Sequence, residues 1–512
     1  MILRESGTWI WGLSNIPRRR RERLIARAAL VLRRGGVVAF PTETVYGLAA
    51  DGLSPSAVRR VFRAKGRPRD NPLILHLHGR GQAPELADVD RRAWDLMGEF
   101  WPGPLTVILP ATRRVPLEVR AGLPTVALRC PDHPVALDLI RESGTALAGP
   151  SANRSGRPSP TSARHVLEDL AGRVGVILDG GPSGIGVEST VVDMSSQVPT
   201  ILRPGGLSRE DLEGALGRVQ VGRYQKGQIP PSPGMKYRHY APRARVYLVR
   251  GGHEQVIRAM MRLSEQLERR AVSVGYLVCG EGDSGLLPGP VISLGKREAP
   301  EQAASRLYRA LRDFDRLAVD VVLAEEVEAT GLGMAVSDRL ARAALLQIEA
   351  DEVMDMSPEP PKSVLMVCSG NTCRSPMAEA LLKDLLPGVK VMSAGVAARD
   401  GAPVSGEARA LLARRDLDLE DHRAQRVTRD LVQGADLVLV MTRTHLDLMR
   451  REFPQFSSRI RLLAQEAGCG QQDIIDPFGG GSEIYEETLD QLEKVLRALV
   501  RRWSWGPGDE AL

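Results

Sequence analysis

The chain has 512 residues, enough for about three ordinary domains, and its 43% apolar and 26% charged residues exclude a disordered or fibrous protein. No apolar run approaches the roughly 18 residues that a membrane-spanning helix requires, and five cysteines, an odd and sparse number, favour a reducing cytoplasm over a disulfide framework. The net charge is uneven: +8 over residues 1–220, +4 over 221–350 and −6 over 351–512. The basic N-terminal part could bind polyanions, although so small an excess of positive charge is more typical of an ordinary solvated surface.

Two proline-containing stretches divide the chain into three segments. Residues 222–243 contain Pro230, Pro231 and Pro233 and show little periodicity, and residues 351–362 (DEVMDMSPEPPK) are acidic and proline-rich. We therefore expect domains over 1–221, 244–350 and 363–505, joined by these linkers. The second linker favours tethered, independent domains.

The first segment begins with a strand along which Trp9 and Trp11 alternate. The arginines from Arg18 to Arg21 and Arg23 could form an RNA clamp, but a solvated first turn of a helix over Glu22 to Leu32 is the simpler interpretation. A strand over Gly36 to Phe40 and a helix over Ser54 to Ala64, with Ser54 as its N-cap, follow.

The other two segments repeat an alternation of strands and helices. In the second, strands are expected at Val246–Val249, Val272–Val278 and Val319–Leu323, with helices near Glu254–Arg269 and Glu301–Arg316. In the third, they are expected at Ser363–Val367, Lys390–Ser393 and Ala435–Met441, before a last helix from Ser482 to about Arg502. This pattern predicts an α/β protein throughout, with mainly parallel sheets covered by helices.

Polar clusters follow the apolar stretches of the first segment. They are Pro41–Thr44, Lys65–Arg67 with Asn71, Thr125–Arg129, Pro150–Asn153, Glu188–Thr190 and Arg203–Gly205. Each also has an ordinary structural explanation. The charge of Lys65 could interact favourably with the dipole at a helix C-terminus, and Ser151 with Asn153 could form a turn. Together, their cations, hydroxyls and amides suit an ATP-like polyphosphate with a small polar co-substrate. No Gly-x4-Gly-Lys-Ser/Thr loop is present, and no cysteine accompanies His76 for a zinc site.

These clusters resemble the threonylcarbamoyl-AMP synthase family over about residues 24–215. The similarity lies in Phe40–Leu48, Ala64–Pro68, Asn71–Ile74, Trp101–Thr106, Pro150–Asn153 and Ile201–Gly205. It implies a YrdC-like α/β domain with a twisted mixed sheet. Ser232–Pro242 and Gly331–Ala335 resemble the family's long form, which implies a small Rossmann-like α/β domain and a linker that runs over the active site.

The resemblance implies the reaction and its residues. The family joins L-threonine, bicarbonate and ATP to give threonylcarbamoyl-AMP and pyrophosphate for tRNA modification. Its catalysis is mainly positioning and charge neutralisation, for which Lys65 and Arg67 are suited. Matching positions imply threonine contacts at Thr44, His76, Arg129 and Ser189, and nucleotide contacts at Arg67, Asn71, Thr125, Ser151, Asn153, Ser159, Arg203 and Tyr240.

Other implied properties concern metal, partners and pocket size. Magnesium is expected with ATP, with no protein ligand that can be named. The product would pass to a tRNA threonylcarbamoyl transferase complex, and a weak or transient tRNA contact is compatible with the basic front. Gly149 stands where the family often has Ala or Thr, which predicts a slightly roomier threonine side.

Two other functions compete for the first segment. Hydrogenase-maturation carbamoyltransferases share the fold but carry paired-cysteine zinc modules, for which this chain lacks the cysteines. A non-catalytic RNA-binding module would also suit a basic front. Tight tRNA binding without threonine-dependent pyrophosphate release would favour that module.

The strongest motif is Val364 to Glu379, in which Cys368 is followed by Ser369, Gly370, Asn371, Thr372, Cys373, Arg374 and Ser375. A buried strand ends at Cys368, and a helix is expected to begin with Ser375 as cap and Pro376 at N1. Loop amides and the helix N-terminus then surround one anion-sized hollow, which favours a Cys368 thiolate, while Arg374 can bind two phosphoryl oxygens. Asp476, before the last helix, is the candidate proton donor. A buried inert thiol and a simple Asp-Pro turn are the alternative explanations.

This segment resembles the low-molecular-weight protein phosphatases, which have a parallel sheet flanked by helices. The family's nucleophile, phosphate-binding arginine and general acid match Cys368, Arg374 and Asp476, and its loop Asn and Ser match Asn371 and Ser375. Tyrosine phosphatases of the family commonly have Ile before the second loop Cys and Tyr after the Asp-Pro pair. Thr372 and Phe478 stand here, which is similar to the protein-arginine-phosphatase branch and implies phosphorylated proteins as substrates and no cofactor.

Tyrosine phosphatase activity remains the alternative specificity. Thioredoxin-linked arsenate reductases share the loop but need additional relay cysteines, and only Cys469 follows Cys373. Cys368 and Cys373 are close enough in sequence for reversible oxidation, although Cys373 could equally be a packed loop thiol.

Overall fold

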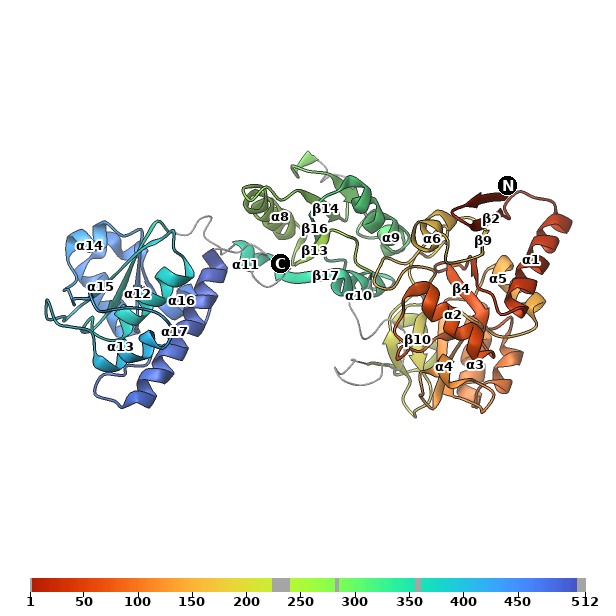
Figure 1. The fold of residues 1–512 in the computed structure, drawn as a ribbon, viewed down its shortest axis with the longest axis horizontal. Coiled ribbons are helices and arrows are strands. Elements are labelled where there is room, and N and C mark those ends of the chain that lie inside the picture. Colours follow the sequence, from red (N-terminus) through yellow and green to blue (C-terminus); the bar gives the residue numbers. More distant parts are fainter. Residues whose placement is uncertain (1, 223–239, 281–284, 355–360, 504–512) are drawn as a thin grey trace. The chain divides into compact units, whose positions relative to one another are not determined.

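The computed structural model describes residues 2–222, 240–280, 285–354 and 361–503, which belong to two compact units, Met1–Met354 and Asp355–Leu512 (Figure 1). Most of the first expected linker lies outside the described residues, with Pro230, Pro231 and Pro233 and the Ser232–Pro242 motif up to residue 239, and so does half of the second linker. Within the described chain, no helix is long and apolar enough to cross a membrane.

The first domain of unit 1 is built on a mixed sheet of twelve strands, as the resemblance implied. In spatial order they are β1 (Ile2–Glu5), β2 (Thr8–Gly12), β9 (Val176–Asp179), β3 (Val38–Phe40), β4 (Gly47–Asp51), β8 (Leu147–Ala148), β5 (Ile74–His76), β7 (Thr125–Arg129), β6 (Leu105–Pro110), β10 (Thr190–Asp193), β11 (Thr200–Arg203) and β12 (Gln220–Val221). The general expectation of mainly parallel pairing is wrong here, because β6 lies antiparallel to β7 and β11 antiparallel to β10.

Helices cover this sheet by their apolar faces. They are α1 (Arg18–Arg33), α2 (Pro55–Lys65), α3 (Arg91–Phe100), α4 (Leu117–Arg120), α5 (Pro134–Ser143), α6 (Ala163–Leu170) and α7 (Arg209–Leu216), with a 3-10 helix η1 (Arg80–Glu85). Helix α2 buries Val58 and Val61 in one core, and α1 buries Leu24 and Ile25 in another. The alternation of Trp9 and Trp11 is confirmed, since Trp9 is exposed and Trp11 buried. Helix α1 begins at Arg18, so the arginines form its first turn.

The second domain of unit 1 has a parallel five-stranded sheet, two strands more than predicted. Its order is β15 (Val291–Ser293), β14 (Val274–Val278), β16 (Val321–Glu325), β13 (Arg245–Arg250) and β17 (Ala344–Glu349). Its helices are α8 (His253–Glu268), α9 (Pro300–Leu317), α10 (Gly333–Ala343) and α11 (Ala350–Met354). Helix α11 corrects the expected start of the second linker at Asp351, because it is regular structure held by the burial of Ala350 and Val353.

Unit 2 is a parallel four-stranded sheet between two helical layers, as predicted. The strand order is β19 (Lys390–Gly395), β18 (Ser363–Cys368), β20 (Leu437–Val440) and β21 (Ile460–Leu462), of which β21 was not expected. The helices are α12 (Arg374–Leu385), α13 (Gly406–Ala413), α14 (Arg429–Gln433), α15 (Arg443–Glu452), α16 (Leu463–Glu466) and α17 (Ser482–Trp503), with a 3-10 helix η3 (Pro454–Arg459). Helices α12 and α17 pack on one core, and α14 and α15 on the other.

Candidate active sites

One cavity of unit 1 gathers nine of the residues singled out in the sequence. They are Lys65, Arg67, His76, Arg129, Ser151, Asn153, Ser189, Arg203 and Tyr240. The sheet topology explains why these residues converge. Strands β5 and β7 run parallel and end on the same side of the sheet. Strand β11 also ends on this side, and β10, which runs antiparallel to β11, begins there. Among the described residues that line the cavity are four basic side chains and one carboxylate, Glu188, so this wall attracts anions.

Lys65 fixes the loop that carries Ser151 and Asn153. Its buried ammonium donates to the Ser151 carbonyl, to the Asn153 carbonyl at 2.6 Å and to Asn153 Oδ1 at 3.1 Å. The helix-dipole explanation is therefore wrong, because these oxygens belong to another loop and not to α2. Burial, with the charge of Arg67, lowers the pKa of Lys65 below its ordinary value.

Arg129, at the end of β7, organises the other side of the cavity. Its Nη2 donates to Glu43 Oε1 and to Thr44 Oγ1, both at 2.7 Å, so Thr44 is held behind the cavity wall rather than in it. Among the described residues, Arg129 Nε, His76 Nδ1 and Glu43 Oε2 are buried without a hydrogen-bond partner. Buried orphan groups at a cavity are groups that a polar ligand can satisfy.

His76 is a neutral group in this site. Burial, followed by the charge of Arg129, lowers the pKa of His76 to about 3, and its ring packs edge-on against Phe40 with centroids 5.6 Å apart. The roomier pocket expected at Gly149 is not found. A Cβ on Gly149 would lie 2.8 Å from His76 Nδ1, so the imidazole occupies the space that the missing methyl leaves.

Three predicted nucleotide contacts do not line this cavity. Asn71 is buried, and both polar atoms of its side chain lack a partner among the described residues. Thr125 begins β7, about 13 Å from Arg129 by the rise of an extended strand. Ser159 is buried and donates to Glu188 Oε1 at 2.6 Å.

Sequence reasoning missed a charged cluster beneath the cavity. Glu188 also accepts hydrogen bonds from Tyr308 on α9 and Arg339 on α10, both in the second domain. Burial alone would raise the pKa of Glu188, but Arg339 and Arg203 outweigh it and lower the pKa to about 2. The only local signal was the polar run Glu188–Thr190, because the two partners are 120 and 151 residues away in sequence.

The cavity measures about 60 Å³, well below the roughly 300 Å³ of the smaller ligand pockets. Tyr240, buried and with a φ of +69°, forms part of its wall. A positive φ is costly for so bulky a residue, so the surrounding contacts must hold it in place. A nucleotide therefore requires some part of this wall to move.

In unit 2, a cavity of about 160 Å³ is lined by Cys368, Ser369, Gly370, Thr372, Cys373, Arg374, Asp476 and Phe478. Cys368 ends the buried strand β18, and the following loop surrounds its sulfur. The Asn371 N–H approaches Cys368 Sγ at 3.2 Å and Ser375 Oγ lies 3.0 Å from it. Both contacts place hydrogen-bonding groups directly around the sulfur.

Ser375 is not the helix cap that the sequence predicted. Helix α12 begins at Arg374 with Cys373 in the cap position, and no side chain caps it. The Ser375 hydroxyl lies beside Cys368 Sγ and accepts from Asn371 Nδ2 at 3.0 Å. The geometry of the loop therefore overrides the local capping signal.

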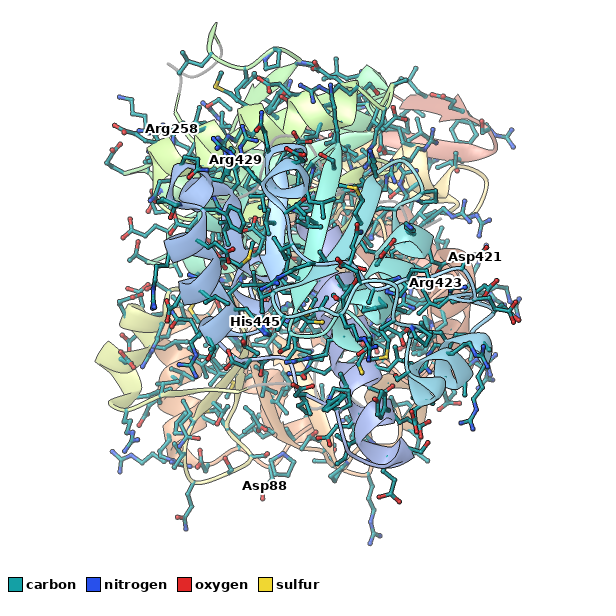
Figure 2. The ribbon with its side chains drawn as sticks, turned by 90° about the vertical axis from the view of Figure 1, so that its left-hand side faces the viewer. Asp88, Arg258, Asp421, Arg423, Arg429 and His445 are labelled. Carbon is teal, nitrogen blue, oxygen red and sulfur yellow. The ribbon has the colours of Figure 1, made fainter. Side chains whose placement is uncertain are left out.

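Asp476 and Arg374 face the same cavity as Cys368. Arg374 Nη2 lies 2.5 Å from Asp476 Oδ2 and 3.3 Å from Ser369 Oγ. His445, labelled in Figure 2, lies on α15 with Nε2 2.9 Å from Ser369 Oγ. Burial and the charge of Arg374 lower the pKa of His445 to about 4, so this imidazole is neutral near pH 7.

The second loop thiol has a partner other than Cys368. Cys373 Sγ lies 3.1 Å from the Tyr485 hydroxyl on α17, and both cysteines are free thiols. Burial and this contact raise the pKa of Tyr485 to about 12. The packed-thiol interpretation of Cys373 matches this arrangement.

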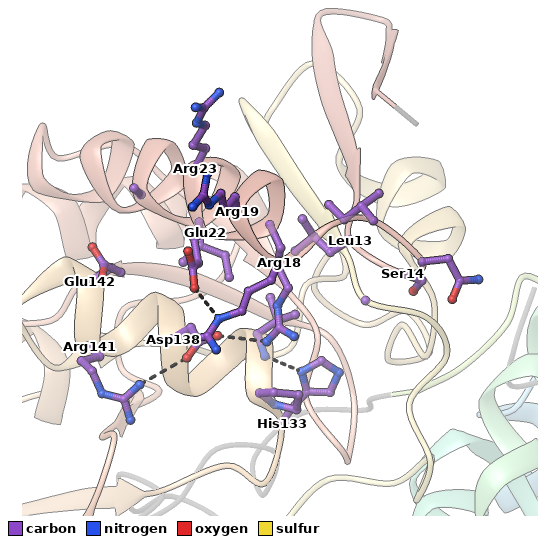
Figure 3. Close-up of a pocket in the computed structure, with 18 residues that line it drawn as sticks. Leu13, Ser14, Arg18, Arg19, Glu22, Arg23, His133, Asp138, Arg141 and Glu142 are labelled. Carbon is purple, nitrogen blue, oxygen red and sulfur yellow. Dashed lines mark hydrogen bonds and ion pairs between the residues drawn. The ribbon is translucent and has the colours of Figure 1, made fainter.

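A further cavity of unit 1 contains none of the predicted catalytic or substrate-binding residues. It has a volume of about 1080 Å³ and lies where α1 meets α5, with Arg18, Arg19, Arg21, Arg23 and Arg141 around it (Figure 3). Asp138 pairs with Arg21 at 2.9 Å and with Arg141 at 3.2 Å, and Arg18 pairs with Glu22 at 2.8 Å. Several of these charges are thus neutralised locally, as expected of a solvated helix face.

Comparison with known proteins follows the same division of the chain. Residues 30–205 match the family described as "Telomere recombination" (Sua5, YciO and YrdC). Residues 207–345 match "Threonylcarbamoyl-AMP synthase, C-terminal domain", and residues 363–504 match "Low molecular weight phosphotyrosine protein phosphatase".

Individual proteins give the same result. The threonylcarbamoyl-AMP synthase of Bacillus subtilis is 47% identical over 324 residues, 62% of this chain and 92% of that protein. A crystal structure of P. abyssi Sua5 complexed with L-threonine is 44% identical, covers 66% of this chain and 99% of its own, and superposes with a TM-score of 0.63. The YwlE arginine phosphatase from Geobacillus stearothermophilus is 39% identical, covering 28% of this chain and 92% of its own, with a TM-score of 0.27. The chain therefore belongs to the threonylcarbamoyl-AMP synthase family and carries a low-molecular-weight phosphatase domain at its C-terminal end.

Proposed function

We propose that unit 1 makes threonylcarbamoyl-AMP and pyrophosphate from L-threonine, bicarbonate and ATP. The main supporting observation is the cavity lined by Lys65, Arg67, Arg129 and Arg203, with Glu188 as the one carboxylate among the described lining residues. Such a wall stabilises the charge of a triphosphate and of the pyrophosphate that leaves it. A relative that covers two thirds of this chain was crystallised with L-threonine, which supports threonine as the co-substrate.

The residues divide into two roles in this proposal. A carbamate formed from the threonine amine attacks the α-phosphorus of ATP, and the bond to pyrophosphate breaks. Arg129, with its free Nε, and neutral His76 are placed to bind the amino acid, whereas Arg67 and Arg203 are placed to bind the nucleotide. Desolvation lowers the pKa of Arg67 to about 10, which still leaves it a cation near pH 7. Lys65 acts by holding the Ser151–Asn153 loop.

Magnesium would be carried by the triphosphate. Among the described residues, no group of three or more His, Cys, Asp or Glu side chains could hold a metal ion. Glu188, the lining carboxylate, has both oxygens occupied by protein donors and does not fit as a ligand. The product would then serve a tRNA threonylcarbamoyl transferase.

Pyrophosphate release tests the synthase. We expect release that requires both threonine and bicarbonate, and its loss in Lys65→Ala and in Arg67→Ala. Arg63→Ala, at an exposed position of the same helix α2, is the matched control and should retain wild-type rates. Tight tRNA binding with no threonine-dependent release by the wild-type chain would instead identify an RNA-binding module.

We propose that unit 2 hydrolyses phosphorylated proteins through Cys368. The thiolate attacks phosphorus, the bond to the leaving group breaks, and Asp476 gives that group its proton. Water then attacks the phosphocysteine, Asp476 takes a proton from it, and phosphate leaves. Arg374 and the loop amides hold the phosphoryl oxygens, and Ser375 with the Asn371 N–H stabilises the sulfur as it leaves.

Phosphoarginine is the substrate that the cavity supports best. Thr372 presents a small polar side chain to the cavity where a branched apolar one would suit a phenol ring. Asp476 is half exposed beside this opening and can pair with a guanidinium as well as protonate it. Phosphotyrosine is the alternative substrate, and Phe478, 80% exposed at the rim, is a side chain on which its ring could stack.

A phosphatase panel separates the two substrates. We expect faster hydrolysis of phosphoarginine than of phosphotyrosine peptides, a reversed preference in Thr372→Ile, and loss of both activities in Cys368→Ser. Cys469→Ser, a partly exposed cysteine outside the cavity, should behave as wild type. A strong wild-type preference for phosphotyrosine would overturn the arginine assignment.

A further inference from the structure

The carboxylate of Glu188 is the point at which the two domains of unit 1 meet beneath the synthase cavity. Its Oε2 accepts from the Tyr308 hydroxyl at 2.8 Å and from Arg339 Nε at 2.9 Å, and both donors belong to the second domain. Its Oε1 accepts from Ser159 at 2.6 Å, within the first domain. One side chain of the cavity wall is thus oriented by residues from both domains.

Arg339 extends the same connection to the neighbouring wall. This fully buried guanidinium donates through Nη2 to the Pro204 carbonyl at 2.8 Å and through Nη1 to Asp338 at 2.6 Å. Pro204 directly follows Arg203, whose own guanidinium donates to the Ser189 carbonyl at 2.9 Å. Arg339 therefore supports both strand ends, at Ser189 and at Arg203, that bound the cavity.

Aromatic rings fill the space around this cluster. Tyr240 and Tyr308 lie with ring centroids 5.4 Å apart, and the Arg339 guanidinium lies 5.4 Å above the Tyr240 ring. Helix α9 approaches closely, since a Cβ on Gly186 would lie 2.4 Å from the Ala304 carbonyl oxygen. Glu188 is thus almost fully buried, and a carboxylate there depends on its partners.

A second buried ion pair joins the domains without touching the cavity. Arg312, on α9 with Tyr308, pairs with Asp169 on α6 at 2.8 Å, and both side chains are almost fully buried. Neither residue lines the synthase cavity. Arg312 also donates to the Pro158 carbonyl, directly before Ser159. Arg316, on the same helix α9, instead pairs with Glu168 on α6 at 2.8 Å, and this pair separates the cohesion of the domains from an effect on the site.

We propose that Tyr308 and Arg339 are positioning residues of the synthase, which act by holding the Glu188 carboxylate and, through it, Ser159, and by holding Arg203 through the adjacent Pro204 carbonyl. The second domain thus completes the nucleotide side of a cavity that the first domain lines. The threonine side, at Arg129 and Thr44, shares no hydrogen bond or ion pair with these two residues in the described chain. This inference rests on the proposed synthase activity.

Steady-state kinetics of the full chain tests the inference. In Tyr308→Phe, which removes one hydroxyl, and in Arg339→Met, the KM for ATP should rise by about tenfold or more, the effect of losing a hydrogen bond to a charged group. The KM for threonine should change by less than about threefold. Arg339→Lys should recover part of the ATP affinity, because it restores the charge without the Pro204 contact. Arg316→Met should lower thermal stability slightly, because it removes a partly exposed ion pair between the domains, and should leave both KM values near wild type.

A pH profile adds a readout that loss of packing alone would not move. Without Arg339, the Glu188 carboxylate loses its main counter-charge, so the variant should lose activity at higher pH than wild type as the solution is acidified. Unchanged KM for ATP in both Tyr308→Phe and Arg339→Met, or an equal rise in Arg316→Met, would overturn the inference. A wild-type chain that releases no threonine-dependent pyrophosphate would overturn the proposed function itself, which keeps the two failures distinct.

Discussion

Asn371 tests how the phosphatase loop is held, because its backbone and its side chain make separable contributions. The residue is fully buried with a φ of +56°, a left-handed conformation that Asn and Gly tolerate better than other residues. Its Nδ2 donates to Ser375 Oγ at 3.0 Å and to Ser393 Oγ at 2.8 Å, and its Oδ1 accepts from the Gln425 N–H at 2.9 Å. Asn371→Ala removes all three bonds and strains the backbone, whereas Asn371→Gly removes only the bonds.

The expected losses follow from these contacts. Three hydrogen bonds at about 1 kcal/mol each give about 3 kcal/mol for Asn371→Gly, and the left-handed backbone adds about 1 kcal/mol for Asn371→Ala. Hydrogen exchange of the β18–α12 segment in the full chain measures this difference, and phosphatase kcat should fall in both variants because Ser375 loses its orientation. Equal losses in the two variants would refute the backbone argument, and losses below about 1 kcal/mol in both would refute the network.

Three further predictions concern acid, metal and the amino-acid side of the synthase cavity. The pKa of His445 is about 4 in the folded chain and about 6.5 in the unfolded chain, so the unfolded chain binds the proton more tightly. The free energy of unfolding of unit 2 should therefore fall by up to about 3 kcal/mol as the pH is lowered from 6.5 to 4. In His445→Asn, the urea midpoint should depend less on pH over this range. Excess EDTA should stop pyrophosphate release, since magnesium accompanies ATP, while phosphatase rates in the same sample stay unchanged. Arg129→Ala leaves the buried Glu43 carboxylate without its ion pair, so the KM for threonine should rise by at least about tenfold and the KM for ATP far less; equal changes would argue against the assignment of sides.

Local sequence patterns predicted an element or a motif correctly wherever all of its residues are contiguous in the chain. Strand β18, the loop from Cys368 to Arg374 and the start of α17 were all expected, because an apolar run, a loop motif and a helical period are contiguous. Strands β15 and β21 were missed because three residues are too few to show a period. Strand β17 was missed because only one of its six residues, Ile348, is buried.

Contacts between distant segments were beyond the reach of the sequence. Lys65 at the end of a helix has an ordinary capping explanation, and nothing local indicates that its ammonium reaches a loop 88 residues away. Glu188 was visible only as part of a polar run. Ser375 is a residue type that commonly caps helices, but here its hydroxyl contacts the Cys368 sulfur instead of a backbone N–H of the helix.

The buried ion pairs between the domains of unit 1 also restrict how this sequence can change over generations. A substitution that removes Asp169 leaves Arg312 as a buried charge without its counter-ion, and one that removes Arg339 does the same to Glu188. Each single step passes through a destabilised chain, so the two members of a pair should be replaced together or not at all. Recombination that exchanges one domain for that of a distant relative should succeed only when both pairs are inherited intact.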